Sequence, residues 1–307
     1  MSEPIELQLK YRPKLFKEVI GQAEACRVLL QMTKSDRIPH AVLFTGPSGC
    51  GKTTLARILA SKLRCDRGDL DEKNAADFRG IDTVREIRTR ASLHPLHGTC
   101  RVWIIDECHK LTNDAQNALL KTLEDTPSHA YFFLATTDPS KLIRTIITRC
   151  TEIKVREMSD EALHQLIKAV AEKEGFIVTA EVEDKIVECS AACGRTALVL
   201  LNKIIGIPTE QQVDAIERNA SQQQAITLCR ALLKPTVTWR ELAPLIKAID
   251  EEAESIRWMI LSYMSAVMLG TGPATVRAAA VLEEMRDNFY DTKKAGLVRA
   301  CYALSRR

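Results

Sequence analysis

Residues 46–53 form a complete phosphate-binding loop. They read Gly-Pro-Ser-Gly-Cys-Gly-Lys-Thr, which matches the pattern G-x-x-x-x-G-K-[ST]. An apolar run at 41–44 precedes the loop, and a helix-forming run at 55–60 follows it. A strand, a glycine-rich turn and a helix N-terminus in this order direct backbone N–H groups and the positive end of the helix dipole at phosphate oxygens. The sequence therefore predicts a site for a nucleoside triphosphate.

Four side chains carry the chemistry that this loop predicts. Lys52 would reach the β- and γ-phosphates, and the Thr53 hydroxyl would hold Mg²⁺. The apolar strand candidate 102–105 ends in Asp106 and Glu107, which would complete the Mg²⁺ shell and orient or activate the attacking water. The alternative for Asp106 is a cap on the next helix. The predicted nucleotide contacts of the loop are Gly46, Pro47, Ser48, Gly49, Cys50, Gly51, Lys52, Thr53 and Thr54.

The tetrapeptide 106–109, Asp-Glu-Cys-His, also matches the D-E-x-H signature of a helicase class. A helicase of that class needs a second nucleotide-fold domain with an arginine motif, whereas everything after Glu157 has a helical pattern. We therefore interpret His109 as a local polar residue at a turn between a strand and a helix.

The composition is that of a globular chain with more than one domain. Its 307 residues allow two or three units with sizeable cores, and 46% hydrophobic and 27% charged residues are ordinary values. No run of 18 uncharged apolar residues occurs, and the first residues lack the pattern of a secretory signal. We expect a cytoplasmic protein without a membrane partner.

Ten cysteines are scattered along the chain, and no C-x-x-C pair occurs. This spacing favours buried thiols over a disulfide framework or a zinc site. We expect reduced cysteines and no structural metal.

Charge is concentrated in one region, although the net charge is only +3. Residues 79–101 contain five arginines and two acidic residues. On its own, this excess is as consistent with a solvated helix face as with a binding surface for a polyanion.

The chain changes its pattern near residue 157. Before it, the strand candidates 41–45, 102–105, 131–136 and 153–155 alternate with amphipathic segments, which predicts a parallel sheet covered by helices. After it, only helical patterns remain, with a break at Gly206-Ile207-Pro208. The predicted domains are an α/β domain at 1–157, a small helical domain at 158–207 and an all-α domain at 208–307.

Further motifs resemble the AAA+ ATPases of the sliding-clamp loader family, both the small subunits of replication factor C and the bacterial gamma/tau subunit. They are Leu9–Pro13 with Val19–Gln22, the segment 73–82 (KNAADFRGID), the segment 117–127 (NALLKTLEDTP), the segment 134–139 (LATTDP), Thr148–Cys150 and Gly194–Leu198. The segment 73–82 is similar to the eukaryotic pattern, and 117–127 to the bacterial one. The resemblance implies an AAA+ domain, a helical lid and a collar at the three predicted ranges, and it favours a bacterial or phage source.

The resemblance also implies roles for individual residues around ATP and Mg²⁺. Thr137, or Thr136 as the alternative, would be the first sensor of the γ-phosphate. Arg149 would be an arginine finger that reaches the ATP of a neighbouring subunit; the alternative for it is an exposed salt bridge. Arg195 would be the second sensor, and the alternative for it is packing within the lid. The implied contacts near the base are Tyr11, Arg12, Pro13, Val19, Ile20, Gly21 and Gln22.

In clamp loaders, the arginine-rich region lines a spiral of subunits and follows the DNA backbone. The resemblance therefore implies phosphate contacts for Arg79, Arg85, Arg88 and Arg90, and a clamp contact for Leu93 and Leu96, for which a buried turn is the alternative. The bacterial relative's cysteine zinc module is missing here, because only Cys65 remains in that segment. No zinc is expected.

The function that follows is an ATP-hydrolysing motor subunit of a clamp loader. It would act in a ring-like spiral of subunits, a pentamer, with the sliding clamp and primer-template DNA as partners, in the cytoplasm of a bacterium or of a phage's host. The alternatives are another AAA+ DNA motor, for branch migration of Holliday junctions or helicase loading, and a nucleotide-binding scaffold subunit without turnover.

Overall fold

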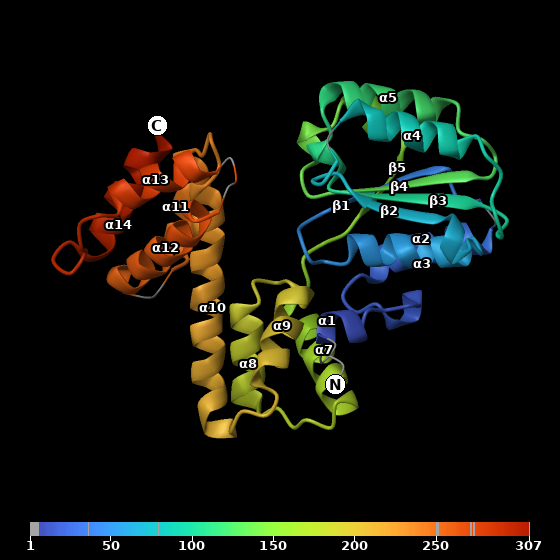
Figure 1. Cartoon of the computed structure of the whole chain (residues 1–307). Coiled ribbons are helices and arrows are strands. Elements are labelled where there is room, and N and C mark those ends of the chain that lie inside the picture. Colours follow the sequence, from blue (N-terminus) through green and yellow to red (C-terminus); the bar gives the residue numbers. More distant parts are fainter. Residues whose placement is uncertain are drawn as a thin grey trace. The chain divides into compact units, whose positions relative to one another are not determined.

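A computed structural model describes residues 6–35, 37–78, 80–249, 252–270, 272 and 274–306, apart from the side chains of 218–223. The chain divides between Ile205 and Gly206 into two compact units. Each unit is described by itself (Figure 1).

The first unit contains a five-stranded sheet with the order β2-β3-β4-β1-β5. All neighbouring strands are parallel. The strands are β1 (Ala41–Thr45), β2 (Leu70–Asn74), β3 (Arg101–Asp106), β4 (Ala130–Thr136) and β5 (Thr151–Lys154). The predicted parallel sheet is confirmed, with β2 as an additional edge strand. Because the strands are parallel, the carboxyl ends of β1, β3 and β4 lie at the same edge of the sheet.

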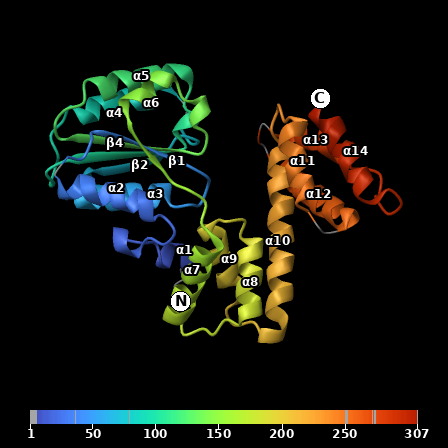
Figure 2. The same cartoon turned by 180° about the vertical axis from the view of Figure 1, so that it is seen from behind.

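Helices cover both faces of this sheet (Figures 1 and 2). Phe44 and Ile104 pack with the helices of one face, whereas Leu43 and Trp103 pack with those of the other. Both faces are therefore buried, which explains the nearly continuous apolar runs of β1, β3 and β4. The helices are α2 (Ala23–Lys34) and α3 (Lys52–Lys62) on one face, and α4 (Ile81–Ala91), α5 (Asn113–Glu124) and α6 (Arg144–Arg149) on the other.

The rest of the first unit is helical. A short N-terminal helix, α1 (Leu7–Lys10), precedes the sheet, and α7 (Asp160–Lys173), α8 (Ala180–Cys189) and α9 (Gly194–Ile204) follow it. The hydroxyls of Ser159 and Thr179 cap α7 and α8 by accepting a backbone N–H from the first turn of each helix. Short 3₁₀ turns lie at Phe16–Glu18, Arg67–Asp69, Cys108–Lys110 and Pro139–Lys141.

The second unit is all-helical. Its helices are α10 (Thr209–Leu232), α11 (Trp239–Lys247), α12 (Ala253–Met268), α13 (Thr275–Glu284) and α14 (Lys293–Ser305). Ile256, Ile260 and Met264 of α12 are buried in its core. A buried ion pair of 2.8 Å joins Glu254 and Arg257 on the same helix.

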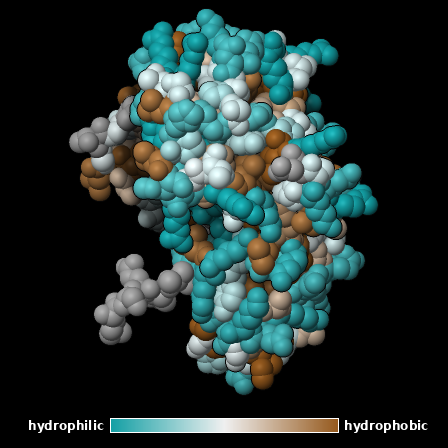
Figure 3. Space-filling model, turned by 90° about the vertical axis from the view of Figure 1, so that its right-hand side faces the viewer, coloured by the Kyte–Doolittle hydropathy of each residue, from teal (hydrophilic) through white to brown (hydrophobic). Residues whose placement is uncertain are grey.

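The face drawn in Figure 3 carries mostly hydrophilic side chains, with hydrophobic ones scattered among them. None of the helices in the described parts of the chain is both long and apolar enough to traverse a lipid bilayer.

Candidate nucleotide-binding site

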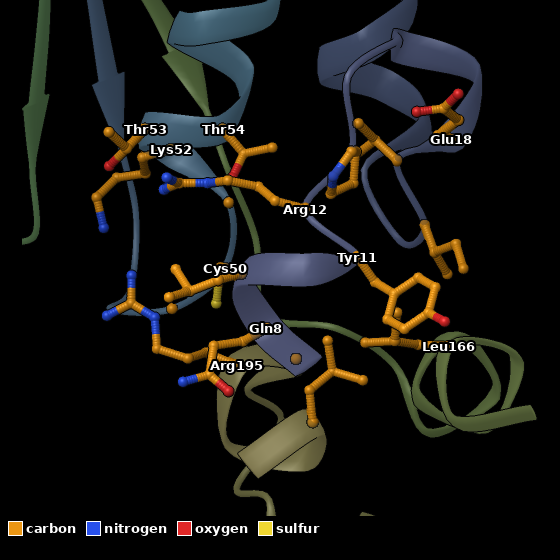
Figure 4. Close-up of a pocket in the computed structure, with 18 of the residues that line it drawn as sticks. Gln8, Tyr11, Arg12, Glu18, Cys50, Lys52, Thr53, Thr54, Leu166 and Arg195 are labelled. Atoms are coloured by element: carbon orange, nitrogen blue, oxygen red, sulfur yellow. The ribbon is translucent and has the colours of Figure 1, made fainter. Parts of the chain in front are cut away.

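A cavity of about 700 Å³ opens in the first unit between the phosphate loop, the N-terminal segment and the helices α7 and α9. Figure 4 shows its two ends: the nitrogen-bearing ends of Lys52, Arg12 and Arg195 lie on one side, and the Tyr11 ring and Leu166 on the other. A cationic end beside an aromatic and apolar end suits a ligand with phosphates at one end and a ring at the other. The predicted nucleotide contacts that line the cavity are Tyr11, Arg12, Pro13, Val19, Ile20, Ser48, Gly49, Cys50, Gly51, Lys52, Thr53, Thr54 and Arg195.

The glycines of the phosphate loop adopt a backbone that other residues avoid. The φ angles of Gly46, Gly49 and Gly51 are 146°, 74° and 103°. A side chain at Gly46 would collide with the carbonyl oxygen of Val155, and one at Gly49 would collide with the Cys193 sulfur. Glycine is therefore required for the turn and for the close approach of its neighbours.

Lys52 begins α3 and is 5% exposed. Its Nζ donates hydrogen bonds to the carbonyl oxygens of Gly46 at 2.8 Å and Pro47 at 2.7 Å, so the ammonium lies within the curve of the loop. Burial lowers the pKa of Lys52 from its ordinary value. The ammonium has three donors and uses two of them here, which leaves one for a phosphate oxygen.

The next residue, Thr53, joins the loop helix to β3. Its hydroxyl donates to Asp106 Oδ2 at 2.7 Å, and the backbone N–H of Glu107 donates to Asp106 Oδ1 at 2.9 Å. A hydroxyl and a carboxylate are oxygen ligands that suit Mg²⁺. The described residues contain no group of three His, Cys, Asp or Glu side chains that could hold a metal alone. The pair of Thr53 and Asp106 fits Mg²⁺, because this ion is usually bound by one or two carboxylates together with water and phosphate oxygens.

Glu107 follows β3 and has a left-handed backbone with φ of 49°. It lines the cavity, and its Oε2 accepts a hydrogen bond of 2.9 Å from the Thr137 hydroxyl. The Nδ1 atom of His109 lies 3.3 Å from the same oxygen and 3.0 Å from the hydroxyl oxygen of Thr136. Both threonines considered as the first sensor thus belong to one network, which also includes His109, the residue interpreted from the sequence as a local polar side chain at a turn.

The N-terminal segment closes the other end of the cavity. Lys10 Nζ donates to Glu174 at 2.7 Å, and the ammonium groups of Lys10 and Lys173 lie 5.3 and 5.6 Å from the centre of the Tyr11 ring. Nε of Arg12 donates to the Thr54 hydroxyl at 3.1 Å. These contacts connect the segment to both the loop helix and the end of α7.

Not every predicted nucleotide contact lines the cavity. Gly21, Gln22, Gly46 and Pro47 are outside its wall. Gln22 is 4% exposed, and its side chain donates to the carbonyl oxygens of Arg156 at 2.7 Å and Cys50 at 3.4 Å. Its Oε1 accepts the Arg156 N–H at 3.1 Å. Gln22 therefore connects the phosphate loop to the segment that leads into α7.

Arg195 lies in the first turn of α9, and it lines the cavity beside the loop. The preceding Cys193 contacts the loop, with its Sγ 3.6 Å from the Ser48 carbonyl oxygen. The first turn of α9 is thus held against the phosphate loop.

Arg149 does not line the cavity of its own chain. It ends α6 on the other face of the sheet, and its guanidinium lies 2.5 Å from the Glu124 carboxylate. Both side chains are about two-fifths exposed, at 38% and 39%. The structure therefore shows the salt bridge considered for Arg149 and separates this residue from Lys52 and Glu107.

The four arginines considered for DNA differ in their surroundings. Arg85 pairs with Asp82 at 3.2 Å, and Arg90 pairs with Asp71 at 2.9 Å. Arg88 is exposed on α4. Arg79 lies outside the residues that the structure describes.

The segment with Leu93 and Leu96 is fixed by a buried carboxylate. Asp69 accepts the backbone N–H groups of Leu96 at 2.7 Å, His97 at 2.9 Å and Gly98 at 3.0 Å, and it pairs with Arg101 at 3.1 Å. Leu93 and Leu96 are 56% and 68% exposed, so the alternative of a buried turn is wrong. No sequence motif indicated this role of Asp69.

The fold resembles solved AAA+ motors. The Holliday junction branch migration motor RuvB of Thermotoga maritima matches with a TM-score of 0.60 and 21% identity, over 86% of this chain and 94% of that one. A point mutant of the same motor matches with a TM-score of 0.59 and 22% identity, over the same shares. At this identity the likeness establishes the fold alone, a parallel α/β domain with helical regions after it.

The sequence relatives of this chain include subunits of bacterial DNA polymerase III. DNA polymerase III subunit gamma/tau of Mycobacterium tuberculosis is 32% identical over 304 residues, which are 92% of this chain and 50% of the relative. Subunit tau of Bacillus subtilis is 31% identical over 90% of this chain and 53% of its own length. Over about nine-tenths of its length, the chain is similar to DNA polymerase III subunits gamma/tau and tau. A family model described as DNA polymerase III, delta subunit, also matches residues 21–79 and 71–159.

This similarity confirms the resemblance to clamp-loader ATPases. The chain spans about half the length of the curated relatives it matches. The RuvB-like alternative is related to it through the shared fold.

Proposed function

We propose that this chain is an ATP-hydrolysing motor subunit of a DNA sliding-clamp loader. One observation carries the proposal: Lys52, the Thr53 and Asp106 pair, and Glu107 line one cavity in a chain that is similar to gamma/tau subunits over most of its length. A binding scaffold would need the phosphate loop, but it would not need a carboxylate such as Glu107 beside the predicted metal ligands.

Each side chain has a task in phosphoryl transfer to water. Lys52 and Arg195 neutralise charge on the phosphates, and Glu107 orients the attacking water. Thr53 and Asp106 would hold Mg²⁺, which supplies positive charge to the β- and γ-phosphate oxygens when bound. The Thr137 hydroxyl donates a hydrogen bond to the Glu107 carboxylate, at the place where the first sensor is expected.

Arg149 completes a site on the next subunit in this proposal. It does not line its own cavity and it lies at the exposed end of α6, where a neighbouring subunit can reach it. A spiral of five subunits, joined by the helical second unit, would then close around ATP, open the clamp and place it on primer-template DNA. Hydrolysis would release the clamp.

The test is ATP turnover by the assembled complex, with and without the clamp and primed DNA. We expect low turnover alone and a large increase when both are added. Equal turnover under all conditions would contradict the loader function. Stimulation by a four-way junction would favour branch migration, and tight ATP binding without turnover would favour a scaffold.

A further inference from the structure

His109 lies directly beside the side chain proposed to act on water, but outside the cavity. Its ring is in the 3₁₀ turn Cys108–Lys110, and its side chain is only 9% exposed. Glu107 lines the cavity, whereas His109 does not. The histidine can therefore act on the reaction only through Glu107.

The negative oxygen near Nδ1 favours a proton on this nitrogen of the ring. Nδ1 lies 3.3 Å from Glu107 Oε2, and an ionised carboxylate only accepts hydrogen bonds. A proton on Nδ1 makes this contact attractive, whereas a lone pair there would face the negative oxygen. We assign the Nδ1–H tautomer on this ground.

Thr136 fixes the ring on the sheet. It ends β4 and is fully buried, and its hydroxyl oxygen lies 3.0 Å from His109 Nδ1. The same oxygen accepts the backbone N–H of Asp138 at 3.0 Å. The imidazole is thus held between a strand end and the Glu107 carboxylate.

The ring is also neutral in this position. Burial lowers the pKa of His109, an effect that the Glu107 charge opposes and the charges of Lys141 and Lys110 reinforce. A neutral donor orients a carboxylate without the strong stabilisation of its ionised form that an imidazolium would bring.

We propose that His109 is a positioning residue that holds the Glu107 carboxylate for hydrolysis. The inference rests on the proposed ATPase function. Thr137 donates to Oε2 and His109 Nδ1 lies 3.3 Å from the same oxygen, which leaves the lone pairs of Oε1 for the attacking water. Without the histidine, one hydrogen bond from Thr137 would have to hold a flexible side chain that starts from a left-handed backbone.

A matched pair of substitutions tests this geometry. In His109→Asn the amide nitrogen can take the place of Nδ1, whereas in His109→Gln it reaches the place of Nε2. In the assembled complex we expect His109→Asn to keep kcat within about threefold, and His109→Gln and His109→Ala to lower kcat by roughly 10- to 100-fold. KM for ATP and the affinity for ADP should stay unchanged in all three, because nucleotide binding does not involve His109.

Two further variants separate positioning from folding. Thr136→Val keeps the shape of the side chain and removes its hydroxyl, so its effect on kcat should not add to that of His109→Ala. Lys110→Ala changes an exposed residue of the same turn and should match wild type. Melting temperatures of all variants report any general loss of structure.

The inference is overturned if His109→Gln and His109→Ala turn over ATP like wild type, or if KM changes instead of kcat. It is also overturned if His109→Asn loses as much activity as His109→Ala. A wild-type complex without turnover would overturn the proposed ATPase function as well, which distinguishes the two failures.

Discussion

The guanidinium of Arg149 lies 2.5 Å from the carboxylate of Glu124, where α6 and α5 end together on the surface. Because Arg149 does not line the cavity of its own chain, Arg149→Ala should leave the nucleotide affinity of the isolated chain unchanged. In the assembled complex it should lower ATP turnover by roughly a thousandfold, the effect of removing an arginine finger. Fluorescent nucleotide binding and steady-state ATPase assays measure the two quantities.

A matched control lies at the other end of the same helix. Arg144 is exposed at the start of α6, and Arg144→Ala should affect neither quantity. Mixing Lys52→Ala and Arg149→Ala subunits should restore part of the turnover if one chain serves its neighbour's site. No recovery in any mixture would contradict the role of Arg149 in trans.

Thr53→Val removes the hydroxyl that contacts Asp106 and keeps the shape of the side chain. We expect half-maximal ATPase activity to require at least about tenfold more Mg²⁺, because the metal would lose one of its two protein ligands. A Mg²⁺ titration of turnover measures this shift. Ser61→Ala, on the exposed side of the same helix, is the control and should titrate like wild type.

Asp69 should make the first unit sensitive to acid. Burial raises the pKa of this carboxyl, but the backbone N–H groups of His97, Leu96 and Gly98 and the Arg101 guanidinium outweigh burial and hold the pKa well below its usual range. The carboxylate therefore stabilises the fold fully above the unfolded pKa of about 4, and this contribution is lost as the pH falls through the lower folded pKa.

In Asp69→Asn, the amide cannot accept all these bonds, which should cost about 1–3 kcal/mol of unfolding free energy near neutral pH. The difference from wild type should shrink as the pH falls from about 5 to about 2, as urea unfolding at several pH values would measure. A constant difference over this range would contradict the role of the ionised carboxylate.

Arg88 should contribute more to DNA binding than Arg90. Arg88 is exposed, whereas Arg90 already pairs with Asp71. Arg88→Ala should make the log–log salt slope of primed-DNA binding shallower by about 0.9, the value for one duplex phosphate contact. Arg27→Ala, an exposed arginine of α2 on the other face of the sheet, is the control. An unchanged slope in Arg88→Ala would exclude a phosphate contact there.

The elements with local signals were predictable from the sequence. The phosphate loop specifies a strand and a helix around it, and the strand that ends in Asp106 has the apolar run of a buried parallel strand. Thr112, Ser159 and Thr179 cap helices because short polar side chains accept the free N–H groups of the first turn.

The elements that depend on distant partners were not predictable. The strand β2 is polar because it lies at the sheet edge, where Glu72 pairs with Arg57 and Asp71 with Arg90. The contacts of Gln22 with Arg156 join residues 134 positions apart. Such pairings follow from the packed fold, and no periodicity or motif in the sequence indicates them.

We expect the buried amide of Gln22 to link nucleotide binding to the position of the helices that begin with α7. It bonds to the Cys50 carbonyl in the phosphate loop and to both backbone groups of Arg156 before α7. A nucleotide that shifts the loop would therefore change the free energy of different positions of α7 and the helices after it. Such coupling is reciprocal and typically amounts to roughly 5- to 150-fold in affinity. A molecule that fixes the lid would strengthen or weaken nucleotide binding by the same factor, without contacting the nucleotide.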